Sequence, residues 1–238
     1  MKTHGLVMDQ ENSKMSKSRP QHTLIDPTDL LLGSVKLSGQ RLHGFGPDVL
    51  RLWAANHDTD KVFGVEIDDF KDYNDQVNMF RQICRQMLSH LFEFKVASQR
   101  LQFGQLNRID QITLILLAEH LKKQRETMDS QLDVRKYIAE MQKFAKERIA
   151  DFYVELLKNR MLFHRGTQGF HSAQTTLLLL LQSLIIQASP VLMYTAQEVF
   201  QHMPEYLFAD KKPLTVFQMA WPAAELYSED MVKILENF

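Results

Sequence analysis

FKDYNDQVNMFRQICRQMLSHL, residues 70–91, is the most regular segment of this sequence. Its apolar residues recur in alternating steps of three and four, which is the spacing of one face of an α-helix. These residues are Phe70, Tyr73, Val77, Phe80, Cys84, Met87 and Leu91. The pattern predicts a long helix that packs this face against other helices, with Cys84 as a small core residue.

Similar spacing predicts further helices downstream, over about residues 108–125, 132–163 and 171–188. The residues of the second helix that are expected to face inward are Ile138, Met141, Ala145, Phe152 and Leu156. The apolar run at 177–181 is broken by Gln182 and is too short to span a bilayer, so it predicts a buried core helix.

A last helix is expected to begin at Thr195-Ala196-Gln197-Glu198, which has the form of a capping box, and to end before Pro204. Long helices joined by short loops predict a helix bundle.

Residues 1–65 are rich in loops and hold most of the glycines. Asp26 and Pro27 are placed as N-cap and first residue of a short helix, which Gly33 ends. Pro47 opens a second short helix, and Trp53 is interpreted as a packing residue on its apolar face.

Composition narrows the class of protein. The chain has 238 residues and a net charge of -1, so any contact with nucleic acid must use local basic patches. Its single cysteine excludes an intrachain disulfide and a cysteine-based zinc cluster, and we assign no metal site. The first residues lack the apolar run of a signal peptide.

A short polar loop, Lys14-Met15-Ser16-Lys17-Ser18, combines two ammonium groups with two hydroxyls. A mobile cationic loop of this kind can close over a triphosphate and stabilise the charge that develops on it. The plain alternative is a solvated turn with two lysines. The commonest phosphate-binding motifs, the Walker A loop and G-x-G-x-x-G, do not occur in the sequence.

The loop and its neighbours resemble class I aminoacyl-tRNA synthetases in order and approximate spacing. The motifs that carry this resemblance near the start of the chain are HGLVMD at 4–9, KMSKS at 14–18, Asp26-Pro27 and GPDVLRLWAA at 46–55. Further along they are DFYVELLKNR at 151–160, ASPVL at 188–192, TAQEVF at 195–200 and VFQMAWP at 216–222. DVLRLW at 48–53 is similar to isoleucyl-tRNA synthetases more than to valyl or leucyl relatives, and the resemblance covers nearly the whole chain.

This resemblance implies a mainly α chain with three parts. Residues 1–65 would be the C-terminal end of a Rossmann-type class I catalytic domain, 66–105 a connecting helical segment, and 106–238 a helical anticodon-binding domain. The implied reaction activates isoleucine with ATP, with Mg²⁺ expected, and transfers it to tRNA(Ile). Lys17 and Lys14 would be catalytic, and Lys14, Met15, Ser16, Lys17 and Ser18 would bind ATP.

The sequence also departs from the family pattern. Arg19-Pro20 follows the loop where an aliphatic residue and glycine are usual, and proline would stiffen its hinge. The partner signature, His-Ile-Gly-His, is absent, as are the amino-acid pocket and the editing domain. We therefore expect a C-terminal fragment that is inactive alone and meets ATP and isoleucine through a missing N-terminal half. The alternatives are a non-catalytic helical tRNA- or RNA-binding protein and a valine–tRNA ligase.

Contacts with tRNA are predicted at Lys158, Arg160, His164 and Arg165, because they crowd one helix end and include groups that can stack or hydrogen-bond. The alternative is compensation of the helix dipole. We expect a monomer with no membrane partner. The loop at 33–44 is longer than in most bacterial enzymes of the family and resembles the insertion in animal mitochondrial ones. This resemblance favours the mitochondrial matrix, with bacterial cytoplasm as the alternative.

Overall fold

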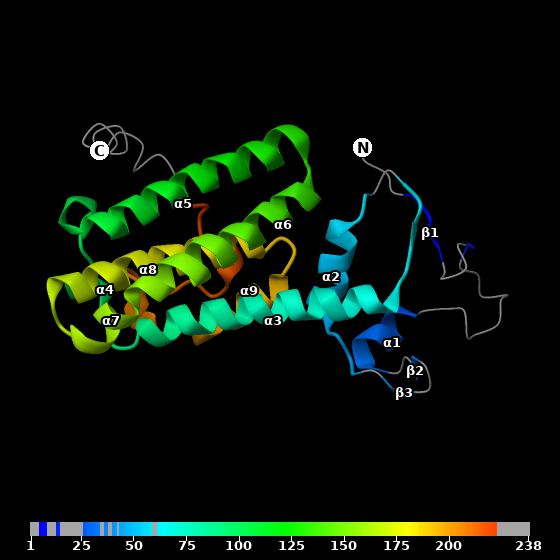
Figure 1. Cartoon of the computed structure of the whole chain (residues 1–238), viewed down its shortest axis with the longest axis horizontal. Coiled ribbons are helices and arrows are strands. Elements are labelled where there is room, and N and C mark those ends of the chain that lie inside the picture. Colours follow the sequence, from blue (N-terminus) through cyan, green and yellow to red (C-terminus); the bar gives the residue numbers. More distant parts are fainter. Residues whose placement is uncertain are drawn as a thin grey trace. The chain divides into compact units, whose positions relative to one another are not determined.

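The computed structural model describes residues 5–8, 13–14, 26–33, 36–37, 40–41, 43–58 and 61–222. The chain forms two compact units, Met1–Met79 and Phe80–Phe238, and most of the described residues are helical (Figure 1). The prediction of a mainly α chain is confirmed. The division between the units lies inside helix α3, Ile67–His90, rather than near residues 65 or 105, and the predicted domain limits stay a prediction.

In the first unit, local signals place the helix ends as predicted. Helix α1 is Pro27–Leu32, and the Asp26 carboxylate accepts a 2.7 Å hydrogen bond from the Thr28 backbone N–H. Gly33 ends the helix with φ 77°, a left-handed conformation that glycine adopts without a steric cost. Helix α2, Pro47–Asn56, begins at its proline. The predictions for both helices are confirmed.

Short strands complete this unit. Strand β1, Val7–Met8, pairs in parallel with β4, Phe63–Gly64, and β2, Lys36–Leu37, pairs antiparallel with β3, Gln40–Arg41. A Cβ at Gly5 would lie 2.3 Å from the Lys61 carbonyl oxygen, so only glycine lets the chain before β1 approach so closely.

Trp53 forms the aromatic core of the first unit. Its ring stacks on Phe70, with centroids 5.4 Å apart, and meets Phe63 edge-on at 5.5 Å. Because α2, β4 and α3 each supply one of these rings, the cluster ties the three elements together. The interpretation of Trp53 as a packing residue is confirmed.

The second unit is a helical bundle. Its helices after α3 are α4 Val96–Gln99, α5 Arg108–Glu126, α6 Val134–Lys143, α7 Glu155–Phe163, α8 Gln168–Ala188 and α9 Met193–His202. Between them lie the single-turn segments η2 Phe103–Gln105, η5 Glu205–Leu207 and η6 Val216–Gln218, and the π-helical segments η3 Thr127–Gln131 and η4 Phe144–Val154. Cys84, at the part of α3 in this unit, is fully buried, as predicted.

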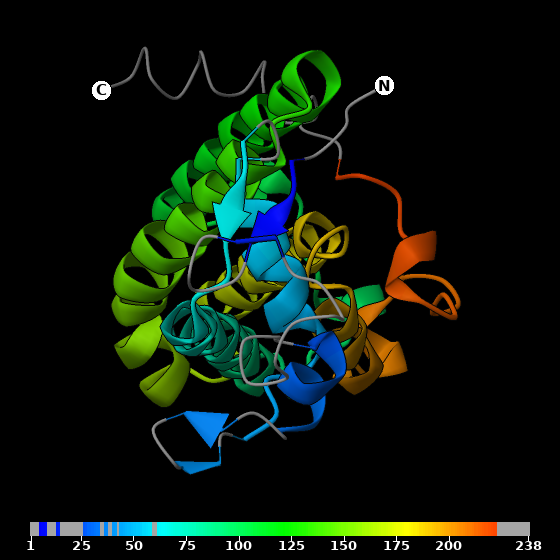
Figure 2. The ribbon, with the colours of Figure 1, turned by 90° about the vertical axis from the view of Figure 1, so that its right-hand side faces the viewer.

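Helix α8 is the core of the bundle, since it packs against α4, α5, α6, α7 and α9 (Figures 1 and 2). It begins three residues earlier than predicted, where the Thr167 hydroxyl caps the Phe170 N–H. Among the described residues it is the helix with the length and hydropathy of a membrane span, but 67% of its apolar window is buried within the protein. The prediction of a buried core helix is confirmed.

The helix predicted over 132–163 contains a π-helical middle that its sequence pattern did not reveal. Ile138, Met141 and Ala145 are buried as predicted. The inward placement of Phe152 and Leu156 is wrong, because they are 43% and 52% exposed. The wider turns of η4, closed by i→i+5 hydrogen bonds, hold more residues than α-helical turns. An α-helical count therefore arrives one residue too early, and the buried residues are their neighbours Tyr153 and Leu157.

The predicted start of the last helix is also wrong. Helix α9 begins at Met193, so Thr195 lies inside its first turn and is buried. The reason is the tight turn that follows α8, in which the Ala188 carbonyl accepts from the Val191 and Leu192 N–H groups. This turn returns the chain to helix before the capping sequence is reached. Glu198 instead pairs with Arg81, 3.1 Å away.

His120 is a half-buried titratable group between α5, η4 and α8. Its ring lies flat on Phe144, with centroids 4.2 Å apart, and its Nε2 is 2.9 Å from Gln187 Oε1. Because a carboxamide oxygen only accepts, Nε2 is the donor in this hydrogen bond. Burial lowers the pKa of His120 to about 4.

His120 should therefore make the bundle sensitive to acid. In the unfolded chain this histidine becomes protonated below about pH 6.5, whereas in the folded protein it stays neutral down to about pH 4. The contribution of His120 to the free energy of unfolding is therefore fully present above pH 6.5. It falls by on the order of 2 kcal/mol as the pH is lowered towards 4. When urea unfolding is measured at several pH values, the free energy of unfolding of His120→Gln should vary less with pH than that of the wild type. The control His202→Gln, at an exposed histidine, should keep the wild-type dependence of the free energy of unfolding on pH. An equal pH dependence in all three proteins would contradict the attribution of this effect to His120.

Candidate nucleic-acid interface

The structure describes only the first residue of the predicted phosphate loop. Lys14 forms an isolated antiparallel bridge with Met8, at the end of β1. Met15, Ser16, Lys17 and Ser18 lie outside the described residues, as do Arg19 and Pro20. The loop's role in binding ATP stays a prediction.

The four predicted tRNA contacts lie together on α7 and the turn after it. Lys158 is exposed and pairs with Glu155 one turn earlier. His164 ends the helix, and its carbonyl accepts a 2.8 Å hydrogen bond from the Thr167 hydroxyl. Arg165 is exposed in the turn itself. We call residues 158–166 the α7 end.

Arg160 differs from the other three because its partner is internal. One guanidinium nitrogen, Nη1, lies 2.7 and 2.9 Å from the two carboxylate oxygens of Asp110. Asp110 is fully buried, and the Arg160 side chain is only 20% exposed. The assignment of Arg160 as a tRNA contact stays a prediction, but its ion pair gives it a structural role.

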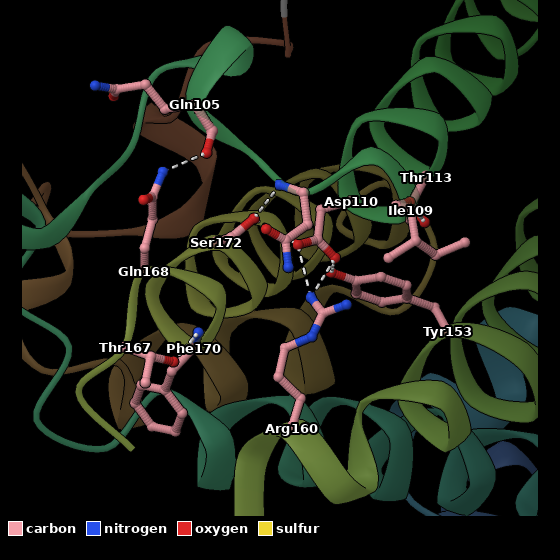
Figure 3. A network of polar contacts seen from close by, with 11 residues as sticks. Gln105, Ile109, Asp110, Thr113, Tyr153, Arg160, Thr167, Gln168, Phe170 and Ser172 are labelled. Atoms are coloured by element: carbon pink, nitrogen blue, oxygen red, sulfur yellow. Dashed lines mark hydrogen bonds and ion pairs between the residues drawn. The ribbon is translucent and has the colours of Figure 1, made fainter. Parts of the chain in front are cut away.

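Asp110 is the centre of a buried polar network (Figure 3). Tyr153 donates to Oδ1 at 2.7 Å, and the Ser172 hydroxyl donates to Oδ2. Ser172 Oγ in turn accepts from the Asn107 N–H at 2.8 Å. Burial raises the pKa of Tyr153 well above its usual range, and the negative charge of Asp110 raises it further, so the phenol stays protonated as a donor.

This network fixes where the α7 end lies. Its members come from the start of α5, from η4, from α7 and from α8, so one carboxylate joins four helical segments. Hydrogen bonds to a buried charge are stronger than those between neutral groups. The turn between α7 and α8 is therefore anchored on both sides, and the charged residues on it have a defined position.

Two features of this region were missed from the sequence. Asp110 follows an apolar residue at the start of a helix, a position that suggests only dipole compensation, and its partners lie 43 to 62 residues away. Phe163, at the end of α7, is 75% exposed beside His164. An aromatic residue next to histidine and arginine at a helix end was the available signal for a stacking surface.

Comparison with known families decides what this bundle is. A family model described as the anticodon-binding domain of tRNA ligase matches residues 110–238, more than half of the chain. The chain belongs to this family. Its match begins at Asp110, so the buried network lies wholly within the family domain apart from Asn107.

Curated relatives match almost the whole length of the chain. The chain is 26% identical to the isoleucine–tRNA ligase of Bordetella avium over 95% of its length, and 28% identical to that of Geobacillus kaustophilus over 99%. It spans about a quarter of the length of these relatives, 23% and 25%. It also resembles a chain in the crystal structure of the Agrobacterium radiobacter K84 agnB2 LeuRS–tRNA–LeuAMS complex. There the TM-score is 0.49 and the identity 15%, over 88% of this chain and 23% of that chain.

Proposed function

We propose that this chain belongs to an isoleucine–tRNA ligase and binds tRNA(Ile) through the bundle formed by residues 80–222. The observation that carries the proposal is the match of the anticodon-binding family to residues 110–238. Isoleucine as the amino acid is supported by the curated relatives, which are isoleucine–tRNA ligases along 95% or more of this chain.

The α7 end supplies the contacts with RNA in this proposal. Lys158 and Arg165 are exposed and carry the positive charge that a phosphate backbone attracts. His164 and Phe163 lie beside them and can stack on a base. Arg160 holds this surface in place through Asp110, because its ion pair ties α7 to the start of α5.

The Lys14–Ser18 loop would act at the ATP site, with Mg²⁺ bound to the triphosphate. Lys17 would stabilise negative charge on the departing pyrophosphate, and Lys14 would support the loop and its charge. The remaining parts of the proposal are a monomer and the mitochondrial matrix, with bacterial cytoplasm as the alternative. The compartment rests on the resemblance of residues 33–44 to an insertion in animal mitochondrial enzymes.

Binding of tRNA by the full chain, titrated between 50 and 200 mM salt, tests the proposal. A tRNA(Ile) transcript should bind more tightly than tRNA(Val). Lys158→Glu together with Arg165→Glu should weaken binding and reduce the slope of log K against log salt by about 1.5, since each lost phosphate contact removes about 0.7–0.9. In a ligase that contains this chain, Lys14→Ala with Lys17→Ala should slow ATP–pyrophosphate exchange with isoleucine.

The control is a matched double charge reversal, Lys143→Glu with Lys146→Glu. Both lysines are exposed on the helical run that leads into α7 but lie outside the α7 end. It should keep the wild-type salt slope. Failure to bind any tRNA would refute the proposal. Equal affinity for all tRNAs would support a non-catalytic RNA-binding protein, and preference for tRNA(Val) would support a valine–tRNA ligase.

A further inference from the structure

A pocket of about 260 Å³ opens beside the α7 end, within the second unit. Its walls come from the end of α3 and the turn after it, from α4, from α7 and the turn after it, and from the start of α8. The residues that the argument uses are Phe92, Glu93, Arg165, Phe170, His171 and Gln174. The volume lies just below the range of about 300–1,000 Å³ for pockets that hold drug-sized ligands, so it suits a smaller flat group.

Two left-handed turns form the rim of this pocket. Glu93 has φ 61°, which is unusual for a residue with a side chain, and Gly166 has φ 77°. The turn at Glu93 leaves Phe92 69% exposed at the pocket, although the neighbouring residues Leu91 and Phe94 are fully buried. Unfavourable backbone conformations are retained mainly where the surrounding structure and function require them.

The floor of the pocket is rigid. Gln174 is buried, donates to the His90 carbonyl at 3.0 Å, and lies 3.2 Å from His171 Nδ1 through its Oε1. The His171 ring meets Phe170 edge-on, with centroids 5.8 Å apart. Because a carboxamide oxygen only accepts, Nδ1 donates to Gln174, and Nε2 is the ring nitrogen left for another partner. The pocket therefore offers aromatic surface, a ring nitrogen, a carboxylate and a guanidinium.

We propose that this pocket receives one unstacked base of a single-stranded RNA loop, with the base stacked on Phe92 and the adjacent phosphate on Arg165. The inference rests on the proposed function and deepens it. Single-stranded RNA is recognised by bases that leave the stack, lie on aromatic side chains and bond through their edges. The Glu93 carboxylate accepts hydrogen bonds from an exocyclic amino group, which all bases except uracil carry.

Charge also favours a nucleotide over an apolar side chain of a protein partner. One negative and one positive residue, Glu93 and Arg165, line the pocket. A base with its phosphate has a donor edge for the first and an anion for the second, whereas an apolar side chain would leave both groups desolvated and unpaired.

The test uses the full chain and an RNA hairpin with the anticodon stem-loop sequence of tRNA(Ile), carrying 2-aminopurine at one loop position at a time. Phe92→Ala should weaken hairpin binding about 5- to 150-fold, the range for loss of one base–aromatic stack, and should leave the salt slope unchanged. Phe92→Trp should retain binding, and one labelled position should show a fluorescence change with wild type but not with Phe92→Ala. Arg165→Gln should instead reduce the salt slope by about 0.7–0.9.

Phe217→Ala is the matched control, since Phe217 is also exposed, at 52%, and lies on η6 outside the residues that line the pocket. It should bind the hairpin like wild type. If Phe92→Ala binds as tightly as wild type, while wild type binds the hairpin, the pocket does not hold a base and the proposed function stands. If wild type does not bind the hairpin at all, the proposed function fails with it.

Discussion

Asp110→Ala is expected to lower the free energy of unfolding of the second unit by about 3–5 kcal/mol, the usual cost of removing one partner of a buried ion pair. The carboxylate accepts from Arg160, Tyr153 and Ser172, and it is fully buried. Without it, a guanidinium with little access to water and two hydroxyls lose their acceptor together. Urea unfolding followed by circular dichroism measures the loss.

The control for this prediction is another acidic residue paired with arginine, but at the surface. Asp129 lies 3.5 Å from Arg125 and both side chains are well exposed. Exposed pairs contribute at most about 1 kcal/mol, so Asp129→Ala should change stability little. Asp110→Leu combined with Arg160→Met should recover much of the loss, because no unpaired charge remains. A loss below about 1 kcal/mol for Asp110→Ala would mean that the buried pair is not formed.

The same variant links stability to the proposed RNA interface. Arg160 is on α7, four residues before His164, and Asp110 is its acceptor at the start of α5. Loss of the carboxylate frees the α7 end from α5, while Lys158, His164 and Arg165 remain in the sequence. RNA binding should then weaken through poorer placement of these residues rather than through loss of charge.

Local signals in the sequence predicted the local features of the fold well. Asp26, Pro27 and Gly33 act within one turn of the helix that they delimit, so their identities are sufficient. The core helix α8 followed from its apolar composition, because burial in a bundle requires little else. The grouping of Lys158, Arg160, His164 and Arg165 at one helix end was likewise readable from their spacing.

Features that depend on distant contacts could not be read in this way. Arg160 was indistinguishable from its neighbouring cations until Asp110, 50 residues away in sequence, was placed against it. The early start of α9 depends on the turn after α8, and the pocket beside Arg165 depends on a turn near residue 93. The hydrophobic periodicity of a helix shows which of its faces is buried, but it does not identify the helix that packs against that face.

The π-helical segment leads to the second large prediction, on two adjacent leucines. Leu157→Ala should lower the free energy of unfolding by about 2–5 kcal/mol, because Leu157 is fully buried and its loss leaves a cavity. Leu156→Ala should change it by less than about 0.5 kcal/mol, since that side chain is half exposed.

The two variants remove the same atoms from neighbouring positions, so helix propensity changes equally and the difference reports the helical register alone. An unbroken α-helix counted from Ile138 through Met141 and Ala145 would bury Leu156 and expose Leu157, which reverses the order of the two effects. The wider turns of η4, over Phe144–Val154, place Ile149, Tyr153 and Leu157 on the core side instead. Since Tyr153 donates to Asp110 from this segment, a larger loss for Leu156→Ala would remove both the π-helical register and the geometry of the buried network.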